Sequence, residues 1–206
     1  MKKNFKIFLF WFIHCTWGII MTLIGSIGAF VMLIIGHKPK RHGYSIYFVA
    51  GHGWGGVCLG PFFFVSDDCD DLDSKTHEAG HSLFQAMTMG PLFPFIVGIP
   101  SMLRYYLFNY KTKGDRLSFS IIVTAIASLI GILAVMLGVI FKTIPLIVVG
   151  SLLLEYIIII FLWLWLDEIE NMENPSYGYY SIWFEKDASE YGMQNYIKNK
   201  EMLKYE

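Results

Sequence analysis

Charged residues and cysteines are both scarce in this chain, and each shortage excludes a class of protein. Charged residues occupy 16% of the 206 positions, compared with about 25% in soluble globular proteins. The formal net charge is -1, so there is no basic surplus of the kind that binds nucleic acid. The three cysteines, Cys15, Cys58 and Cys69, form no C-x-x-C pair and no even set, so we expect free thiols rather than a disulfide scaffold.

Apolar residues are abundant instead, at 55%, and they gather in long blocks. Residues 5–36 contain no acidic residue. This block is longer than the apolar core of a signal peptide, about 7–15 residues, and lacks a cleavage motif, so we expect a retained membrane helix. Blocks 117–141 and 144–166 predict two more membrane helices. The expected fold class is mainly α, a multi-pass helical membrane protein.

A small β element is expected between the first two helical regions. The β-rich runs Tyr44–Ala50 and Val57–Val65 flank four glycines that lie between positions 51 and 56. Glycines at this density are typical of a turn between two strands. The sequence therefore predicts a β-hairpin over residues 44–66.

Two helical regions complete the expected domain organisation. Pro91, Pro94 and Pro100 divide residues 74–108, so we expect broken, partly membrane-embedded half-helices there. Their first helix should begin near Ser74–Thr76, with Ser or Thr as its cap. The polar and aromatic segment 176–196 predicts a C-terminal helix at the membrane surface, and the whole chain 1–206 is expected to form a single membrane-embedded domain.

The distribution of basic residues predicts the sidedness of the last two membrane helices. Because they form a hairpin, segments 104–116 and 167–206 lie on one side of the membrane. The first segment carries four basic residues, whereas the turn between the helices carries only Lys142. Positive charge is enriched in cytoplasmic loops, so both segments are expected in the cytoplasm of a cell-membrane protein.

One motif carries metal chemistry. His77-Glu78-Ala79-Gly80-His81 fits H-E-x-x-H, a pattern of two zinc-binding histidines and a glutamate base on one helix. At positions i and i+4 the two imidazoles project from the same helix face and can bind one ion. Glu78 then lies beside the open coordination position, where it can take a proton from water. The small residues Ala79 and Gly80 permit another element to pack closely.

A catalytic zinc site needs a third protein ligand, and Glu185 is the best candidate. On a helix, Glu185, Ala188, Ser189 and Gly192 follow the i, i+3, i+4, i+7 pattern of one face. That face holds a single carboxylate among small residues, so it can pack against the His77/His81 helix and bring one oxygen to Zn2+.

Other carboxylates remain open as the third ligand. Asp167 and Glu168 follow the last membrane helix, and a Leu-Asp at this place is similar to site-2-type intramembrane proteases. The Asn-Pro and Asp-Gly elements of that family are missing. Glu155 lies in the middle of the last membrane helix, where a carboxylate is a functional candidate. Gln85, one turn beyond His81, can orient a ligand or can be an ordinary polar residue.

The chain resembles gluzincin-type zinc metallopeptidases through His77, Glu78, His81 and Glu185, with Ala188 in the small position after the glutamate. It also looks like small bacterial membrane proteins. The gluzincin resemblance implies that Glu78 is the general base and that the substrate is a peptide bond. It further implies an edge strand before the metal-binding helix, for which Val57–Val65 is the candidate, that holds an extended peptide.

The sequence therefore predicts a membrane-bound zinc-dependent hydrolase, a metallopeptidase acting near the cytoplasmic membrane surface. Its expected partners are the lipid bilayer and a peptide or protein substrate. Three alternatives stay open. The metal site can be purely structural in a non-enzymatic polytopic protein, the protein can be a site-2-type protease that uses Asp167, or it can be a binuclear lipid-modifying oxidase or desaturase. The last needs more clustered histidines than the six scattered here.

Overall fold

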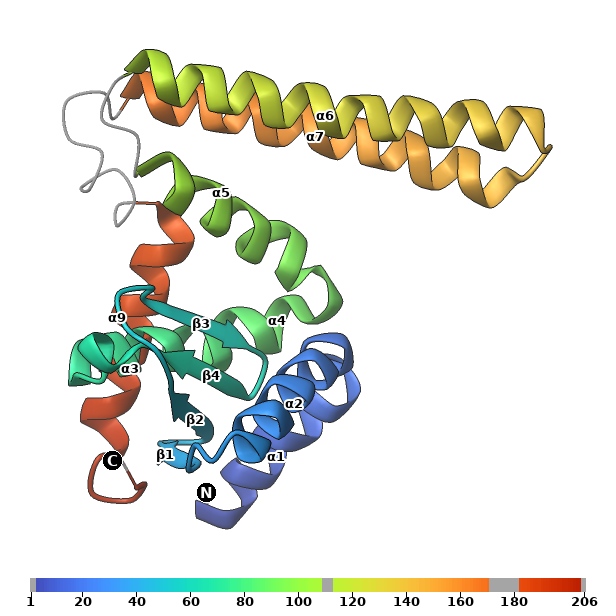
Figure 1. Cartoon of the computed structure of the whole chain (residues 1–206). Helices are drawn as coiled ribbons and strands as arrows, with labels where there is room; N and C mark the ends of the chain where they lie inside the picture. The colour runs from blue at the N-terminus through green and yellow to red at the C-terminus, as the bar shows by residue number, and fades with distance from the viewer. Residues whose placement is uncertain (1–2, 109–112, 171–181, 205–206) are drawn as a thin grey trace. The chain divides into compact units, whose positions relative to one another are not determined.

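The computed structural model describes residues 3–108, 113–170 and 182–204, which form mainly helices with one small sheet (Figure 1). The chain divides into two compact units. The first comprises Met1–Ile99 and Ile182–Glu206, and the second comprises Pro100–Ser181. Every residue of the predicted metal site lies in the first unit.

The N-terminal apolar block is two helices rather than the single membrane helix predicted over 5–36. Helix α1 (Lys3–Thr16) and helix α2 (Ile19–Ile34) meet at an angle of 100°. Gly18 at the break has low helix propensity, and the Thr22 hydroxyl donates to the His14 carbonyl across it at 2.7 Å. The prediction of one continuous helix was wrong because side-chain hydrogen bonds satisfy the backbone at a glycine.

The strands form a four-stranded sheet rather than the predicted hairpin over 44–66. Its order is β1-β2-β4-β3, and β2 pairs with β4 in parallel. The strands are β1 (Lys40–His42), β2 (Ser45–Val49), β3 (Gly56–Leu59) and β4 (Phe62–Val65). The run Val57–Val65 therefore contains a hairpin of its own, turned at Gly60 with φ +71°, and the glycine-rich segment after β2 is a crossover.

Alternating aromatic residues give this sheet two buried faces. Tyr47 and Phe63 stack with ring centroids 5.0 Å apart and pack with Ala79 of helix α3 (Leu72–Gly80). Phe48 and Phe64 point to the opposite face, where they pack against Ala29 of α2. Because strand side chains alternate between faces, the sheet is held between α2 and α3.

The region predicted as broken half-helices over 74–108 is indeed broken, with a bend of 106° after Leu92. Its first helix begins at Leu72 and is capped by Asp71, whose carboxylate accepts from the Ser74 amide at 2.8 Å, not by Ser or Thr. The segments are α3 (Leu72–Gly80), the π-helix η2 (His81–Ala86), α4 (Met87–Met89), η3 (Gly90–Leu92), η4 (Pro94–Gly98) and α5 (Ile99–Phe108).

Helix α9 (Trp183–Asn199) packs antiparallel on α3 at backbone contact. A methyl group added at Gly80 would overlap the Ala188 carbonyl, and one added at Gly192 would overlap the Thr76 carbonyl. Two glycines on opposite helices therefore set the distance between α3 and α9. The predicted C-terminal helix over 176–196 begins at Trp183 in the structure, and 176–181 lie outside the described residues.

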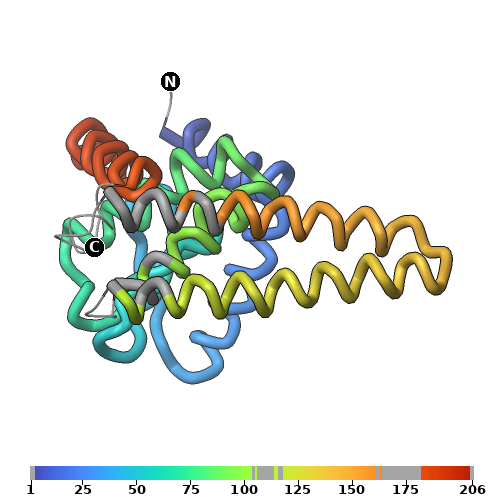
Figure 2. Tube along the Cα trace, turned by 90° about the horizontal axis from the view of Figure 1, so that it is seen from above, coloured from blue at the N-terminus to red at the C-terminus, as the bar shows by residue number. Residues whose placement is uncertain are grey.

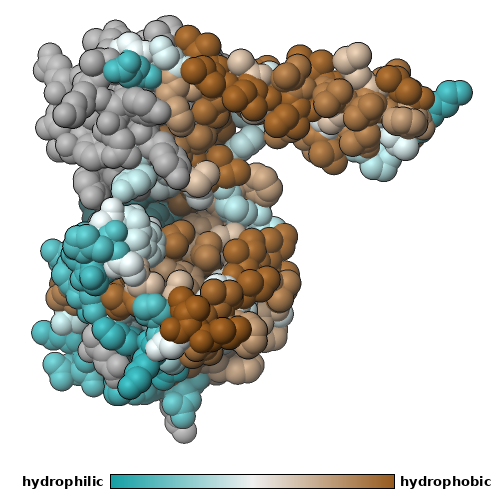
Figure 3. All heavy atoms as spheres, in the orientation of Figure 1, coloured by the Kyte–Doolittle hydropathy of each residue, from teal (hydrophilic) through white to brown (hydrophobic). Residues whose placement is uncertain are grey.

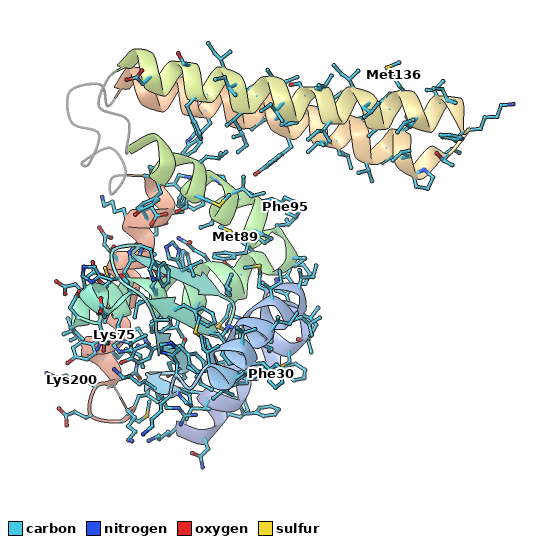
Figure 4. The ribbon with its side chains drawn as sticks, viewed as in Figure 1. Phe30, Lys75, Met89, Phe95, Met136 and Lys200 are labelled. Atoms are coloured by element: carbon cyan, nitrogen blue, oxygen red, sulfur yellow. The ribbon has the colours of Figure 1, made fainter. Side chains whose placement is uncertain are left out.

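The second unit is dominated by an antiparallel pair, α6 (Lys113–Ile140) and α7 (Ile144–Glu170), which lie side by side in Figures 1 and 2. Ser118–Ile140 is long and apolar enough to cross a membrane. Its side chains are mostly exposed, as Met136 illustrates in Figure 4, and apolar atoms cover this helix pair in Figure 3. The described apolar part of α7, Ile144–Ile160, is shorter than the apolar part of α6.

Only α6 meets the length and composition of a membrane span by itself among the residues the structure describes. The α1–α2 pair and the pair Leu72–Leu92 with Pro94–Leu103 meet it when each bent pair counts as one span. The structure thus supports one membrane-crossing helix, and the number of crossings beyond it depends on how the bent pairs meet the bilayer.

The close approach of α3 and α9 predicts the effect of adding one methyl group. Gly80→Ala should lower the free energy of unfolding by about 1–3 kcal/mol, because the new carbon must displace the backbone of α9. Thermal unfolding in detergent, followed by circular dichroism, would measure the loss. Gly98→Ala is the matched control, since only the Pro94 Cβ lies within 4.0 Å of its added carbon. Equal stability of the two variants would contradict this packing.

A buried histidine in β1 predicts acid sensitivity of the first unit. His42 is 1% exposed, and burial, with the nearby Lys75 charge, lowers its pKa from 6.5 to about 4. The unfolded chain therefore binds a proton between these pH values that the folded chain does not. Stability should fall by up to about 3 kcal/mol as the pH drops from 6.5 to 4.

His42→Phe tests this prediction because it keeps a ring in place and cannot titrate. The free energy of unfolding should depend less on pH in the variant than in the wild-type protein across that window. An identical pH dependence for the two proteins would show that His42 is not buried in the neutral form.

Candidate metal centre

Three predicted ligand atoms converge at one point between α3 and α9. The Nε2 atoms of His77 and His81 lie 3.1 Å apart. Oε2 of Glu185 lies 3.1 Å from the first and 3.3 Å from the second. A tetrahedral zinc ion with bonds of about 2.0–2.1 Å holds its ligands about 3.3 Å apart. The triangle therefore matches one face of a zinc coordination tetrahedron.

The burial of Glu185 also fits a bound cation. The residue is 1% exposed, and neither of its carboxylate oxygens has a hydrogen-bond partner in the described residues. A buried carboxylate is costly unless a counter-charge compensates it. The two imidazoles approach within ion-pair distance without aligned hydrogen bonds, as expected for groups that share one ion.

Gln85 determines which tautomer of neutral His81 is present. The Gln85 amide donates to the Phe184 carbonyl, which turns its oxygen toward His81 Nδ1 at 2.7 Å. An amide oxygen only accepts, so Nδ1 must carry the proton. The lone pair of neutral His81 is then on Nε2, the atom that faces Glu185.

Ser189 determines the tautomer of neutral His77 in the same way. Its hydroxyl donates to the Glu185 carbonyl at 3.1 Å, so its oxygen accepts from His77 Nδ1 at 2.8 Å. The Nε2 lone pair of His77 therefore also points into the centre. Both imidazoles are held in the tautomer that a metal needs, by partners from the same two helices that supply the ligands.

The electrostatics of the centre couple His81 to Glu185. Burial acts to lower the pKa of His81, but the Glu185 carboxylate outweighs it and raises that pKa to about 9. Burial acts to raise the pKa of Glu185, but the two imidazoles hold it below its ordinary value. A cation is thus favoured between these residues, whether it is a proton or a metal ion.

Glu78 lies between this centre and the edge of the sheet. It is 7% exposed, and a methyl group added at Gly56 of β3 would lie 2.5 Å from its Oε1. Burial raises the pKa of Glu78, and the two imidazoles oppose that shift. The absence of a side chain at Gly56 is therefore what makes room for the Glu78 carboxylate beside the edge strand.

The π-helix that begins at His81 determines which other side chains surround the His81 ring. It places Gln85 beside His81, and the bend that follows brings the Phe93 ring to 6.3 Å from the His81 ring. Widened helical turns of this kind occur frequently at functional sites. The sequence contained no signal for it, because π-helices have no strong composition of their own.

The structure brings His77, His81 and Glu185 together, it places Glu78 within electrostatic range of all three, and it puts the Gln85 amide oxygen 2.7 Å from His81 Nδ1. It adds Ser189 and Gly56, which the sequence did not identify as functional. The position of Ser189 one turn after Glu185 was the available signal. The small-residue face on which Ser189 lies predicts close helix packing and no hydrogen bond to His77.

The other candidate ligands are outside this group or outside the described side chains. The side chains of Asp167 and Glu168 are outside the described part of the chain, and Glu155 is exposed on α7. A second group of possible ligands, His52 with Asp67 and Asp68, lies on the surface, where His52 is within ion-pair distance of both carboxylates.

Comparison with protein-family models, curated proteins and solved structures finds no match to this chain. The resemblance to gluzincins therefore depends on the residues described above.

Metal affinity should follow this geometry. Glu185→Ala should abolish stoichiometric zinc binding, and Gln85→Leu should weaken it about 10–100-fold, because the His81 tautomer is no longer fixed. Isothermal titration with Zn2+ on the purified chain would measure both effects. The matched controls are Glu190→Ala and Gln194→Leu, exposed residues of α9 that lie away from the centre.

Asp167→Ala separates this ligand set from the alternative one. It should leave zinc affinity unchanged if Glu185 is the third ligand. Loss of zinc in Asp167→Ala with normal affinity in Glu185→Ala would instead support the site-2-type arrangement.

Proposed function

We propose that this protein is a membrane-bound zinc-dependent hydrolase, a metallopeptidase acting near the cytoplasmic membrane surface. The observation that carries the proposal is the convergence of His77, His81 and Glu185 with a fourth polar group, Glu78, beside them. A purely electrostatic cluster would not need both imidazoles held with Nε2 lone pairs pointing inward.

The residues support a division of roles. His77, His81 and Glu185 would hold the ion, which as zinc would supply a Lewis acid and make water more acidic at the site. Glu78 accepts the proton of the attacking water and returns it to the leaving amine. Its burial beside Gly56 supports this role, because burial raises the pKa of the Glu78 carboxyl and so makes its carboxylate a stronger base.

The free edge of the sheet supports a peptide as substrate. Strand β3 pairs only with β4, and its other edge carries no strand among the described residues. Val57 on β3 is 40% exposed, and the Glu78 carboxylate lies against the neighbouring Gly56. An extended peptide that pairs with β3 would pass the proposed base with its backbone held by hydrogen bonds.

Membrane attachment is part of the proposal. Helix α6 supplies one crossing, and α7 with the two bent pairs supplies the others of a multi-pass protein in the cell membrane. The exposed apolar side chains of α2, of which Phe30 points outward in Figure 4 at 64% exposure, support lipid contact by the first unit as well.

A structural metal site is the second candidate, and one observation favours it. The centre is nearly closed, with side-chain exposures of 18% for His77, 8% for His81 and 1% for Glu185. A metal site whose role is only to hold α3 against α9 needs no opening through which a substrate could reach the ion. The oxidase alternative has less support, since the described residues bring only two histidines to this centre.

Glu78→Gln distinguishes a catalytic site from a structural one. The variant should keep wild-type zinc affinity and lose at least about a thousandfold in turnover, because the amide cannot accept the proton. Zinc content and cleavage of a mixed fluorogenic peptide library by the chain in lipid vesicles would be measured together. Glu190→Gln is the matched control, as an exposed glutamate on α9.

Two results would contradict the mechanism. Cleavage by Glu78→Gln at the wild-type rate would remove Glu78 as the base. A wild-type protein that binds one zinc, cleaves nothing and unfolds on chelation would support the structural site.

A further inference from the structure

A groove of about 410 Å³ lies in the first unit, apart from the metal centre. Its walls come from α1, from the π-helix with α4, and from α9. Figure 2 shows α9 beside the beginning of α1. The volume is within the range of about 300–1,000 Å³ that is usual for small-molecule sites.

The charged residues that line the groove are all basic. Lys6 of α1 and Lys198 of α9 are its charged lining residues, and no carboxylate lines it. Neither lysine forms an ion pair with a described acidic residue. The side chains of Gln194 and Asn195 add polar hydrogen-bonding groups on the same wall. In a chain of net charge -1, this local excess of two positive charges favours an anionic ligand.

Apolar side chains line another part of the groove. This part is made by Leu9 and Phe10 of α1 and by Leu83 and Met87 from the π-helix and α4. Phe10 and Leu83 pack together in a buried cluster that continues beneath the groove. A ligand that fills this site therefore needs an anionic part and an apolar part.

Helix α1 connects the groove to a surface suited to lipid. Phe5, Phe8, Leu9 and Phe12 lie at i, i+3, i+4 and i+7 and are 50%, 61%, 36% and 52% exposed. Such a stripe is normally turned toward the core of a water-soluble protein, and here it faces outward. Apolar side chains also gather over this unit in Figure 3. Leu9 belongs both to this stripe and to the groove.

We propose that the groove binds the headgroup of an anionic phospholipid from the surrounding bilayer. Lys6 and Lys198 contact the phosphate, Gln194 and Asn195 bind the polar headgroup, and Leu9 and Met87 contact the first carbons of the acyl chains. Anionic headgroups attract basic residues at the membrane surface by about 1 kcal/mol each. The proposal depends on the membrane attachment in the proposed function and is independent of metal and hydrolysis.

The test measures binding of dioctanoyl-phosphatidylglycerol to the full chain in neutral detergent, from the lipid-dependent rise in unfolding temperature. Dioctanoyl-phosphatidylcholine and inorganic phosphate are the comparison ligands. The wild-type protein should respond to phosphatidylglycerol and not to the other two. Lys6→Gln with Lys198→Gln should weaken the apparent affinity at least tenfold.

The same two elements provide matched controls. Lys3→Gln with Lys200→Gln removes the same charge from α1 and from the residue that follows α9, at positions that do not line the groove; Lys200 points outward in Figure 4. This control should bind like the wild-type protein. Gln194→Trp keeps both charges and fills the groove, so it should also weaken binding. Unfolding temperatures without lipid verify that each variant is folded.

Equal weakening by the two lysine pairs would overturn the proposal in favour of diffuse surface charge. A full response to inorganic phosphate would overturn it in favour of a small-anion site, and an equal response to phosphatidylcholine would remove the charge selection. Glu78→Gln should bind lipid normally, so a failure of the hydrolase proposal and a failure of this one give different results.

Discussion

The contact between the Glu185 carboxylate and the imidazoles of His77 and His81 is the interaction on which the first unit depends. A buried carboxylate is costly unless groups around it compensate its charge, and here those groups come from a segment distant in sequence. That encounter requires α3 and α9 to approach at backbone contact, which Gly80 and Gly192 permit. The two glycines share their helix faces with His77, His81 and Glu185. The same close packing therefore brings the two helices together and brings these side chains into contact.

The sheet has a supporting role that follows from its two faces. One face of aromatic residues holds α2, and the other holds α3 at Ala79, next to the ligands. The parallel pairing of β2 with β4 leaves β3 at an edge, and Gly56 of that edge meets Glu78. The position of the proposed base is therefore determined by strand order as much as by its helix.

The sequence predicted the centre better than the fold around it. H-E-x-x-H and the face of Glu185, Ala188, Ser189 and Gly192 identified both helices, because ligand spacing and small residues are local patterns that helix geometry converts directly into contact. The break at Gly18 and the crossover after β2 were missed. Hydrophobicity alone does not distinguish a straight helix from a bent pair, and strand partners depend on pairing energies that local composition does not encode.

The order of the chain has a consequence for the life of the protein in a cell. His77 and His81 leave the ribosome long before Glu185, and the apolar hairpin of α6 and α7 is made between them. The cluster of His77, His81 and Glu185 therefore cannot form until α9 has been synthesised and has folded back against α3. A nascent or truncated chain without α9 would hold the two imidazoles of His77 and His81 without the carboxylate that faces them.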